Sequence, residues 1–293
     1  MKTIPRCLLL MACLAVAAPA PADEDLTITP DVVYGHKDGM ALTFDVLKPK
    51  EPNGAGVLFM VSGGWYSKWR EPEAMAGQFD DLLQKGFTLF LVRHGSAPKY
   101  TVPEAIDDVR RAVRYVRQNA ERFGVDPQRL GVCGGSAGGH LSLVLGTTGD
   151  DGNPKSLDPL KRVSSRVAAV VAYYPPTYLE PWTHPDSRYY QQFPALRFDP
   201  KLADACSPLS QVTADDAPAL MIHGDADKLV PIDHSQKIQA AFEKSDVESQ
   251  LLTIPGAAHG YRGPDARKAA EARLEWFEKY LLGDSDDLLQ LSR

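Results

Sequence analysis

The residues whose types and spacing could do chemistry lie first in a glycine-rich turn, Gly134-Gly135-Ser136-Ala137-Gly138, which has the spacing G-x-S-x-G. This spacing is typical of a nucleophile elbow, a sharp strand-to-helix turn that holds a serine in a strained backbone conformation. The flanking sequence agrees, because an apolar run precedes the turn at 129–133 and apolar residues recur at helical spacing over 137–145. The sequence therefore predicts Ser136 as a nucleophile.

A serine nucleophile needs a histidine base and a carboxylate that orients it. His223-Gly224-Asp225-Ala226-Asp227 follows an apolar run at 219–222, and Gly256-Ala257-Ala258-His259-Gly260 follows another at 250–254. Asp227 lies further out in its turn and can reach back over the sheet edge, whereas Asp225 is expected to order the turn itself and stays the alternative acid. With His259 as base, the order along the chain is Ser, Asp, His.

Acyl transfer also needs N–H donors aimed at the developing oxyanion. Ala137, directly after the nucleophile, is the first candidate donor. Val61-Ser62-Gly63-Gly64-Trp65 follows a predicted strand, and Gly63 and Gly64 are the candidates from this loop. The histidine that commonly precedes such glycines is absent, and Val61 or Ser62 takes its place depending on how the loop is aligned.

The rest of the chain must position these residues. Two runs separated by a turn, 32–34 and 42–47, predict an antiparallel hairpin. Further strands are predicted at 57–61, 88–92, 130–133, 167–173, 219–222 and 250–254, and helices at 73–84, 103–122, 137–145, 232–242 and 265–282. This alternation predicts a mostly parallel sheet covered by helices on both faces, with sites beyond the carboxyl ends of the strands.

Two stretches invite an interpretation beyond the fold. Four arginines in the 102–123 helix, Arg110, Arg111, Arg114 and Arg117, are expected to form a solvated face. An insertion at 173–208 is rich in aromatic residues, which either bind substrate or pack the insertion onto the sheet. Trp182 in this insertion and Trp65 in the glycine loop are the candidate substrate contacts.

The N-terminal sequence, the net charge and the spacing of the histidines limit which classes of function are expected. Residues 1–22 have the charged, apolar and Ala-x-Ala layout of a signal peptide, so we expect cleavage after Ala22, export, and a single domain over 23–293. A lipoprotein site at Cys13 is the rival interpretation. The net charge of −6 disfavours nucleic acid and anionic membrane as partners, and the apolar run is too short for stable membrane insertion. The histidines lack zinc spacing, so no metal is implied.

With these residues in place, the chain resembles an α/β-hydrolase of the esterase and lipase branch with a G-x-S-A-G-G elbow, which includes carbohydrate acetyl and feruloyl esterases. The resemblance runs from about 57 to 280 and is carried by these stretches: Glu104–Val109, Phe123–Leu130, Gly134–His140, Ser207–Leu209, His223–Pro231 and Gly256–Tyr261.

The resemblance implies an α/β-hydrolase fold with a mostly parallel twisted sheet. It also implies Ser136 as nucleophile, Asp227 as acid, His259 as base, and oxyanion donors from Ala137 and the Gly63-Gly64 loop. The expected activity is hydrolysis of short-acyl carboxylic esters, carbohydrate esters among them, without a cofactor. A prolyl-oligopeptidase-like peptidase and a non-catalytic, hydrolase-like binding protein are the alternatives.

Overall fold

The computed structural model describes residues 25–283. The predicted signal peptide at 1–22 lies outside the described residues. Within that range, none of the helices combines the length and the apolar character needed to cross a membrane.

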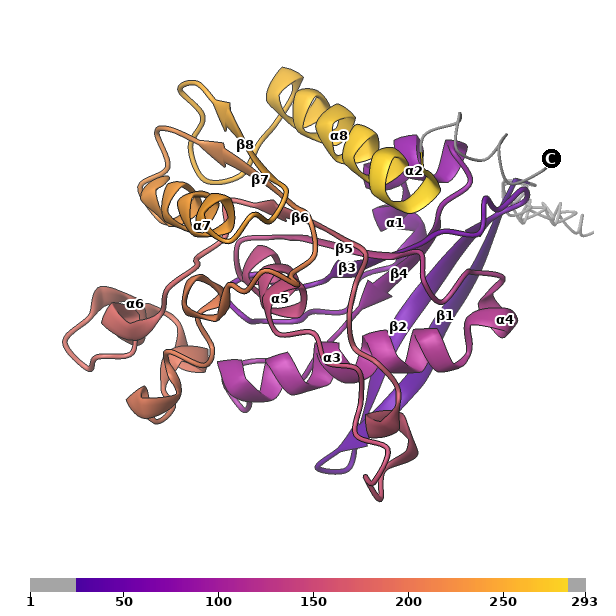
Figure 1. Ribbon diagram of the computed structural model, residues 1–293, viewed down its shortest axis with the longest axis horizontal. Coiled ribbons are helices and arrows are strands. Elements are labelled where there is room, and N and C mark those ends of the chain that lie inside the picture. The colour runs from indigo at the N-terminus through magenta and orange to yellow at the C-terminus, as the bar shows by residue number, and fades with distance from the viewer. Residues whose placement is uncertain (1–24, 284–293) are drawn as a thin grey trace, which may run out of the picture.

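Eight strands form one sheet with the order β1-β2-β4-β3-β5-β6-β7-β8 (Figure 1). The strands are β1 Leu26–Lys37, β2 Met40–Pro49, β3 Gly56–Met60, β4 Thr88–Val92, β5 Leu130–Gly135, β6 Ala169–Tyr173, β7 Ala219–Gly224 and β8 Ser249–Ile254. The hairpin of β1 and β2 is antiparallel and β2 pairs antiparallel with β4, while every pair from β4 to β8 is parallel. The predicted α/β architecture is confirmed.

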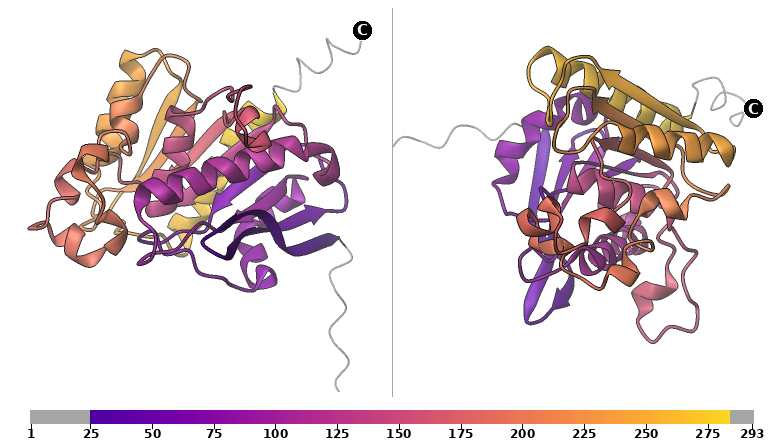
Figure 2. Two further views of the ribbon diagram at one scale, coloured as in Figure 1. Left: turned by 90° about the horizontal axis from the view of Figure 1, so that it is seen from below. Right: turned by 90° about the vertical axis from the view of Figure 1, so that its left-hand side faces the viewer.

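Helices cover both faces of this sheet (Figures 1 and 2). They are α1 Pro72–Ala76, α2 Asp80–Gln84, α3 Val102–Gln118, α4 Ala120–Phe123, α5 Ala137–Thr147, α6 Arg188–Gln192, α7 Asp233–Lys244 and α8 Pro264–Phe277, which continues as a π-helix over Glu278–Leu282. One face carries α1, α2 and α8, and the other carries α3, α5 and α7. The long helix α3 begins where the N–H of Thr101 donates to the Glu104 carboxylate at 2.9 Å.

Alternating strand residues divide the core into two layers. In β4, Leu89 and Leu91 pack with Phe79 and Phe277 on the α2 and α8 side. Phe90, between them, packs on the opposite side among residues of α3 and α5. Successive side chains of a strand point to opposite faces, so a continuous apolar run is what a sheet buried on both faces requires.

The structure corrects the interpretation of the α3 arginines as a solvated face. All four instead reach the segment between α5 and β6, in these pairs: Arg110 with Thr148, Arg111 with Asp158, Arg114 with Asp150, and Arg117 with the carbonyls of Ser164 and Arg166. Periodicity separates the core-facing side of a helix from the other side, but it does not tell whether water or a loop covers that other side.

The insertion that follows β6 holds α6 and three short 3₁₀ helices, Glu180–Trp182, Pro194–Leu196 and Pro200–Leu202. Its aromatic residues stack on one another and on the body of the protein. Trp182 lies parallel to Tyr189 with ring centroids 3.9 Å apart, and Tyr178 stacks on His234 of α7 at 4.0 Å. These contacts favour the packing interpretation for that part of the insertion.

A buried ion pair fastens the hairpin to the parallel part of the sheet. Arg93, directly after β4, forms a two-pronged pair with Asp45 of β2, whose side chain is fully buried, and also reaches Asp31 at 2.8 Å. Removing one partner of such a pair is strongly destabilising, because the other charge is then left buried alone.

We predict that Arg93→Met lowers the free energy of unfolding by about 3–5 kcal/mol, because Asp45 loses its counter-charge. Urea denaturation measures it. Lys50→Met is the control, since Lys50 pairs with Asp25 at 3.8 Å with both side chains exposed and such pairs contribute about 0–1 kcal/mol. Equal effects of the two substitutions would contradict the role of the buried pair.

Candidate active site

Ser136 lies between β5 and α5 in a backbone conformation that a serine rarely adopts, with φ 54° and ψ −118°. The residues two positions to either side of it must be glycines. A Cβ on Gly134 would lie 2.6 Å from the backbone of Gly138, and a Cβ on Gly138 would lie 2.6 Å from the carbonyl oxygen of Met60. The turn therefore presses the first turn of α5 against the ends of β3 and β5, and Ser136 projects at the carboxyl end of the sheet.

Asp227 and His259 meet at the same end. The Nδ1–H of His259 donates to Asp227 Oδ2 at 2.6 Å, although 32 residues separate them. Asp227 Oδ1 accepts the backbone N–H groups of Leu229 and Val230 at 2.8 and 3.0 Å. Burial opposes ionisation of Asp227, but the hydrogen bonds it accepts outweigh burial and hold its pKa well below the usual range of an aspartate. The carboxylate is therefore charged and fixed beside the imidazole.

His223 and Asp225 support this arrangement. His223 is fully buried, its Nε2–H donates to the carbonyl of Val230 at 2.8 Å, and Nε2 also lies 3.5 Å from Asp227 Oδ2. Asp225 Oδ1 accepts the N–H of Gly256 at 2.6 Å and thereby joins the loop after β7 to the loop that carries His259. Asp225 thus orders the loops, and within residues 25–283 the carboxylate that pairs with His259 is that of Asp227.

Tyr174 connects the serine side with the histidine side, and sequence reasoning did not single it out for this. Its ring meets that of His259 edge-on with centroids 4.5 Å apart. Its hydroxyl lies 2.9 Å from where a Cβ on Gly135 would stand, directly before the serine. Ser136 makes no hydrogen bond to His259 in the described part of the chain. Hydrogen bonds of this kind are often loose before a substrate binds.

The structure distinguishes among the candidate donors to the oxyanion. The N–H of Gly63 donates to the carbonyl of Tyr66 at 3.0 Å, and the N–H of Tyr66 donates to the carbonyl of Gly63 at 3.0 Å. Gly63 is thereby corrected as a donor, because its hydrogen is already used inside the loop. Gly64, with φ 57°, stays a candidate from the loop, and Ala137 stays a candidate as the first residue of α5.

A histidine that follows strand β4 hydrogen-bonds to the glycine loop at 61–65, which has no histidine of its own. His94 lies just after β4, and its Nδ1–H donates to the carbonyl of Gly95 at 2.9 Å, so its Nε2 accepts from the hydroxyl of Ser62 at 2.8 Å. Burial lowers the pKa of His94 to about 4, which keeps the ring neutral and this pattern intact. Ser67 adds a second tie, because its hydroxyl donates to the carbonyl of Val61 at 2.6 Å.

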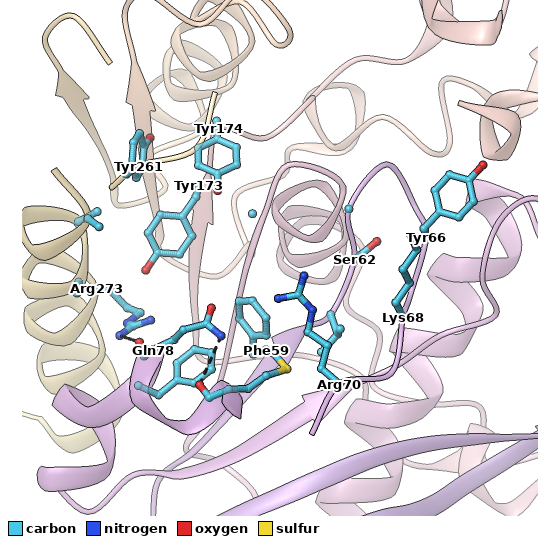
Figure 3. Close-up of a pocket in the computed structure, with 18 residues that line it drawn as sticks. Phe59, Ser62, Tyr66, Lys68, Arg70, Gln78, Tyr173, Tyr174, Tyr261 and Arg273 are labelled. Atoms are coloured by element: carbon cyan, nitrogen blue, oxygen red, sulfur yellow. Dashed lines mark hydrogen bonds between the residues drawn. The ribbon is translucent and has the colours of Figure 1, made fainter. Parts of the chain in front are cut away.

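A cavity of about 710 Å³ opens beside the elbow. Gly135, Ser62 and Gly63 line it near the serine, and Tyr173, Tyr174 and Tyr261 line it on the side of His259 (Figure 3). Phe59, Met75 and Phe79 form an apolar part further from the serine. A site with apolar walls and a few convergent polar groups is typical of small-molecule binding.

Comparison with known proteins identifies the family. The BD-FAE family model matches residues 44–242. This chain belongs to the BD-FAE family and to the α/β-hydrolase esterases. It is 30% identical over 264 residues to ethyl acetate hydrolase of Pseudomonas putida, covering 82% of this chain and 77% of that protein. It is 27% identical over 257 residues to esterase LipQ of Mycobacterium tuberculosis, covering 83% of this chain.

The solved structure of a truncated carbohydrate esterase from gut microbiota superposes on this BD-FAE member with a TM-score of 0.74 and 25% identity, covering 89% of this chain and 99% of that one. The chain spans 59% of the length of LipQ. The likeness to the carbohydrate esterase therefore extends over that whole domain, whereas LipQ contains further sequence that the match does not reach.

In this BD-FAE member neither candidate substrate tryptophan faces the cavity, which corrects both assignments. Trp65 is 2% exposed and its Nε1–H donates to His140 Nδ1 at 3.4 Å. Trp182 is 5% exposed and stacks on Tyr189. Trp65 has a positive φ, and both tryptophan side chains pack in the hydrophobic core. Tyrosines take the place of these tryptophans in the cavity wall.

We predict that Asp227→Asn lowers kcat for ester hydrolysis by about 10⁴, because an amide there favours the wrong tautomer of His259. Asp225→Asn is the matched control, and it should keep kcat within about tenfold while costing on the order of 1 kcal/mol of stability through its weaker bond to Gly256. Steady-state kinetics and thermal melts of both variants measure these effects on kcat and on stability. If Asp225→Asn were the inactive variant, the assignment of the acid would be wrong.

Proposed function

We propose that the protein is an exported serine esterase that hydrolyses short-acyl carboxylic esters through Ser136, His259 and Asp227. The observation that carries the proposal is the 2.6 Å hydrogen bond between His259 and the buried Asp227 at the same sheet end as Ser136 on its strained elbow. Membership of an esterase family supports the reaction type. The N-terminal sequence at 1–22 supports export.

In the proposed reaction, Ser136 Oγ attacks the ester carbonyl while His259 Nε2 takes its proton. Asp227 stabilises the imidazolium that forms and keeps Nδ1 protonated. His259 then returns the proton to the departing alcohol, which leaves an acyl-enzyme. Water repeats the sequence on the acyl-enzyme and releases the carboxylic acid, so the mechanism needs no cofactor.

The negative charge of the tetrahedral intermediate would be held by the N–H groups of Ala137 and Gly64. Ala137 lies at the N-terminus of α5, where unsatisfied N–H groups and the helix dipole favour an anion. The ties of the glycine loop to His94 and Ser67 support this role, since donors catalyse best when they are already in place before charge develops.

The substrate class follows from the relatives and from the cavity. One relative is named for ethyl acetate and one similar structure is a carbohydrate esterase, which supports short acyl groups on small or sugar alcohols. Tyr173, Tyr174 and Tyr261 offer aromatic surface of the kind that suits a sugar ring. We therefore propose carbohydrate esters as the natural substrates.

The first test uses Ser136→Ala. Wild-type protein should react with a fluorophosphonate probe, and the variant should lose labelling and about 10⁴- to 10⁶-fold in kcat while its circular dichroism is unchanged. A panel with a matched ester and amide of the same acyl group separates an esterase from a peptidase. Labelling that survives in Ser136→Ala would place the nucleophile elsewhere, and an unreactive wild-type protein would leave the binding-protein alternative.

The second test is the acyl length. We expect kcat/KM for p-nitrophenyl esters to be highest for acetyl or butyryl and to fall stepwise toward about ten carbons, since each methylene contributes only about 1–3 kcal/mol. Acetylated xylan measured beside this series tests the alcohol side. A maximum at long chains would indicate a lipase, and inactivity on every sugar ester would remove the carbohydrate assignment.

A further inference from the structure

The cavity beside the elbow is positively charged although the protein is acidic. The chain has a net charge of −6, yet the residues that line the cavity include Lys68, Arg70 and Arg273 and no aspartate or glutamate. A cleft lined by one sign of charge concentrates ligands of the opposite sign. This local charge is the feature that the proposed ester hydrolysis does not explain.

Arg273 is neutralised by its own surroundings. It is 4% exposed, pairs with Asp81 at 2.5 Å and donates to the carbonyl of Gln78 at 3.2 Å. The guanidinium therefore fixes α8 to the start of α2 and has little charge left to offer a ligand.

Lys68 and Arg70 differ from Arg273, because neither forms an ion pair within the described residues 25–283. Glu71 and Glu73 follow along the chain, but neither lines the cavity and neither pairs with a cation in that part of the chain. Figure 3 shows the guanidinium of Arg70 extending into the cavity toward Ser62 and Phe59. Two uncompensated cations thus lie on the wall that continues from the oxyanion loop.

We propose that Lys68 and Arg70 bind a carboxylate of the substrate, so that the preferred substrates are esters that carry a carboxylate near the scissile bond. This inference rests on the proposed function. The carboxylate belongs either to the alcohol part, as in an acetylated sugar chain that contains uronic acid, or to the acyl part, as in a half-ester of a dicarboxylic acid.

The chemistry of the two side chains fits this ligand. The planar guanidinium of Arg70 can donate two parallel hydrogen bonds to a carboxylate, and Lys68, whose ammonium lies 5.9 Å from the centroid of the Tyr66 ring, adds a second positive charge on the same wall. The apolar part of the cavity at Phe59 and Phe79 can take the carbon skeleton between the charge and the ester. A neutral ester of the same shape would fill the cavity and leave both cations solvated.

The experiment compares matched substrates on the wild-type enzyme. On the acyl side, p-nitrophenyl hemiglutarate is compared with the p-nitrophenyl ester of monomethyl glutarate, which differs by one methyl cap on the charge. On the alcohol side, an acetylated oligogalacturonate is compared with its methyl-esterified form. We expect kcat/KM to be about 2- to 5-fold higher for the anionic member of one pair at low salt, because Lys68 and Arg70 are exposed. That pair identifies which part of the ester carries the carboxylate.

Variants assign the preference to the two cations. The double variant Lys68→Met, Arg70→Met should equalise the members of that pair through KM while kcat on the neutral ester is unchanged, and Arg70→Glu should favour the neutral ester. Lys155→Met, which removes an exposed cation far along the chain, is the control and should keep the wild-type ratio. Raising the salt to about 1 M should shrink the ratio, because the screening length falls to about 3 Å.

The outcomes are distinguishable from those of the proposed function. Hydrolysis of the neutral esters with equal or lower rates for both anionic partners would overturn the carboxylate site and leave the esterase standing. No hydrolysis of any member would count against the esterase itself. A preference that persists in the double variant would also overturn the proposal, because the selectivity would then come from other residues.

Discussion

The close packing of backbone against backbone at the nucleophile elbow is the constraint on which the other parts of the site depend. Gly134, Gly138 and Met60 approach so closely that a single added Cβ would lie 2.6 Å from a neighbouring carbonyl. This contact joins β5, α5 and the end of β3 without any side chain between them. The loop that begins after Met60 therefore starts beside Ser136, and the oxyanion candidates lie near this serine because the strands β3 and β5 are neighbours.

The sequence predicted the parts that local patterns control. The strand predicted at 57–61 is β3 Gly56–Met60, and the helix predicted at 137–145 is α5 Ala137–Thr147. Continuous apolar runs define strands buried on both faces, and a parallel sheet brings the ends of such strands to one edge. The contact between Asp227 and His259 follows from this rule, since their loops come after the paired strands β7 and β8.

Contacts between distant segments could not be predicted in this way. The arginines of α3 have the helical spacing of a solvated stripe, yet the 148–166 segment lies on them. Two of its aspartates form ion pairs with Arg111 and Arg114. Trp65 belongs to a glycine loop at the site, but its ring packs in the core. In both cases the pattern identifies which side of an element is apolar, whereas the neighbour that covers a side chain is decided by loops that have no periodicity.

The glycine loop at 61–65, which lacks a histidine of its own, shows how contacts with distant segments replace a local contact. His94 accepts from Ser62 near one end of the loop, and His140 accepts from Trp65 at the other while its Nε2–H donates to the carbonyl of Cys206. Burial lowers the pKa of both histidines to about 4, so both rings keep the acceptor nitrogen that the loop requires down to that pH. Protonation would turn each acceptor into a donor and break the tie. Because Asp227 also stays ionised in this range, the hydrogen bonds that hold the glycine loop and the carboxylate beside His259 persist together at mildly acidic pH.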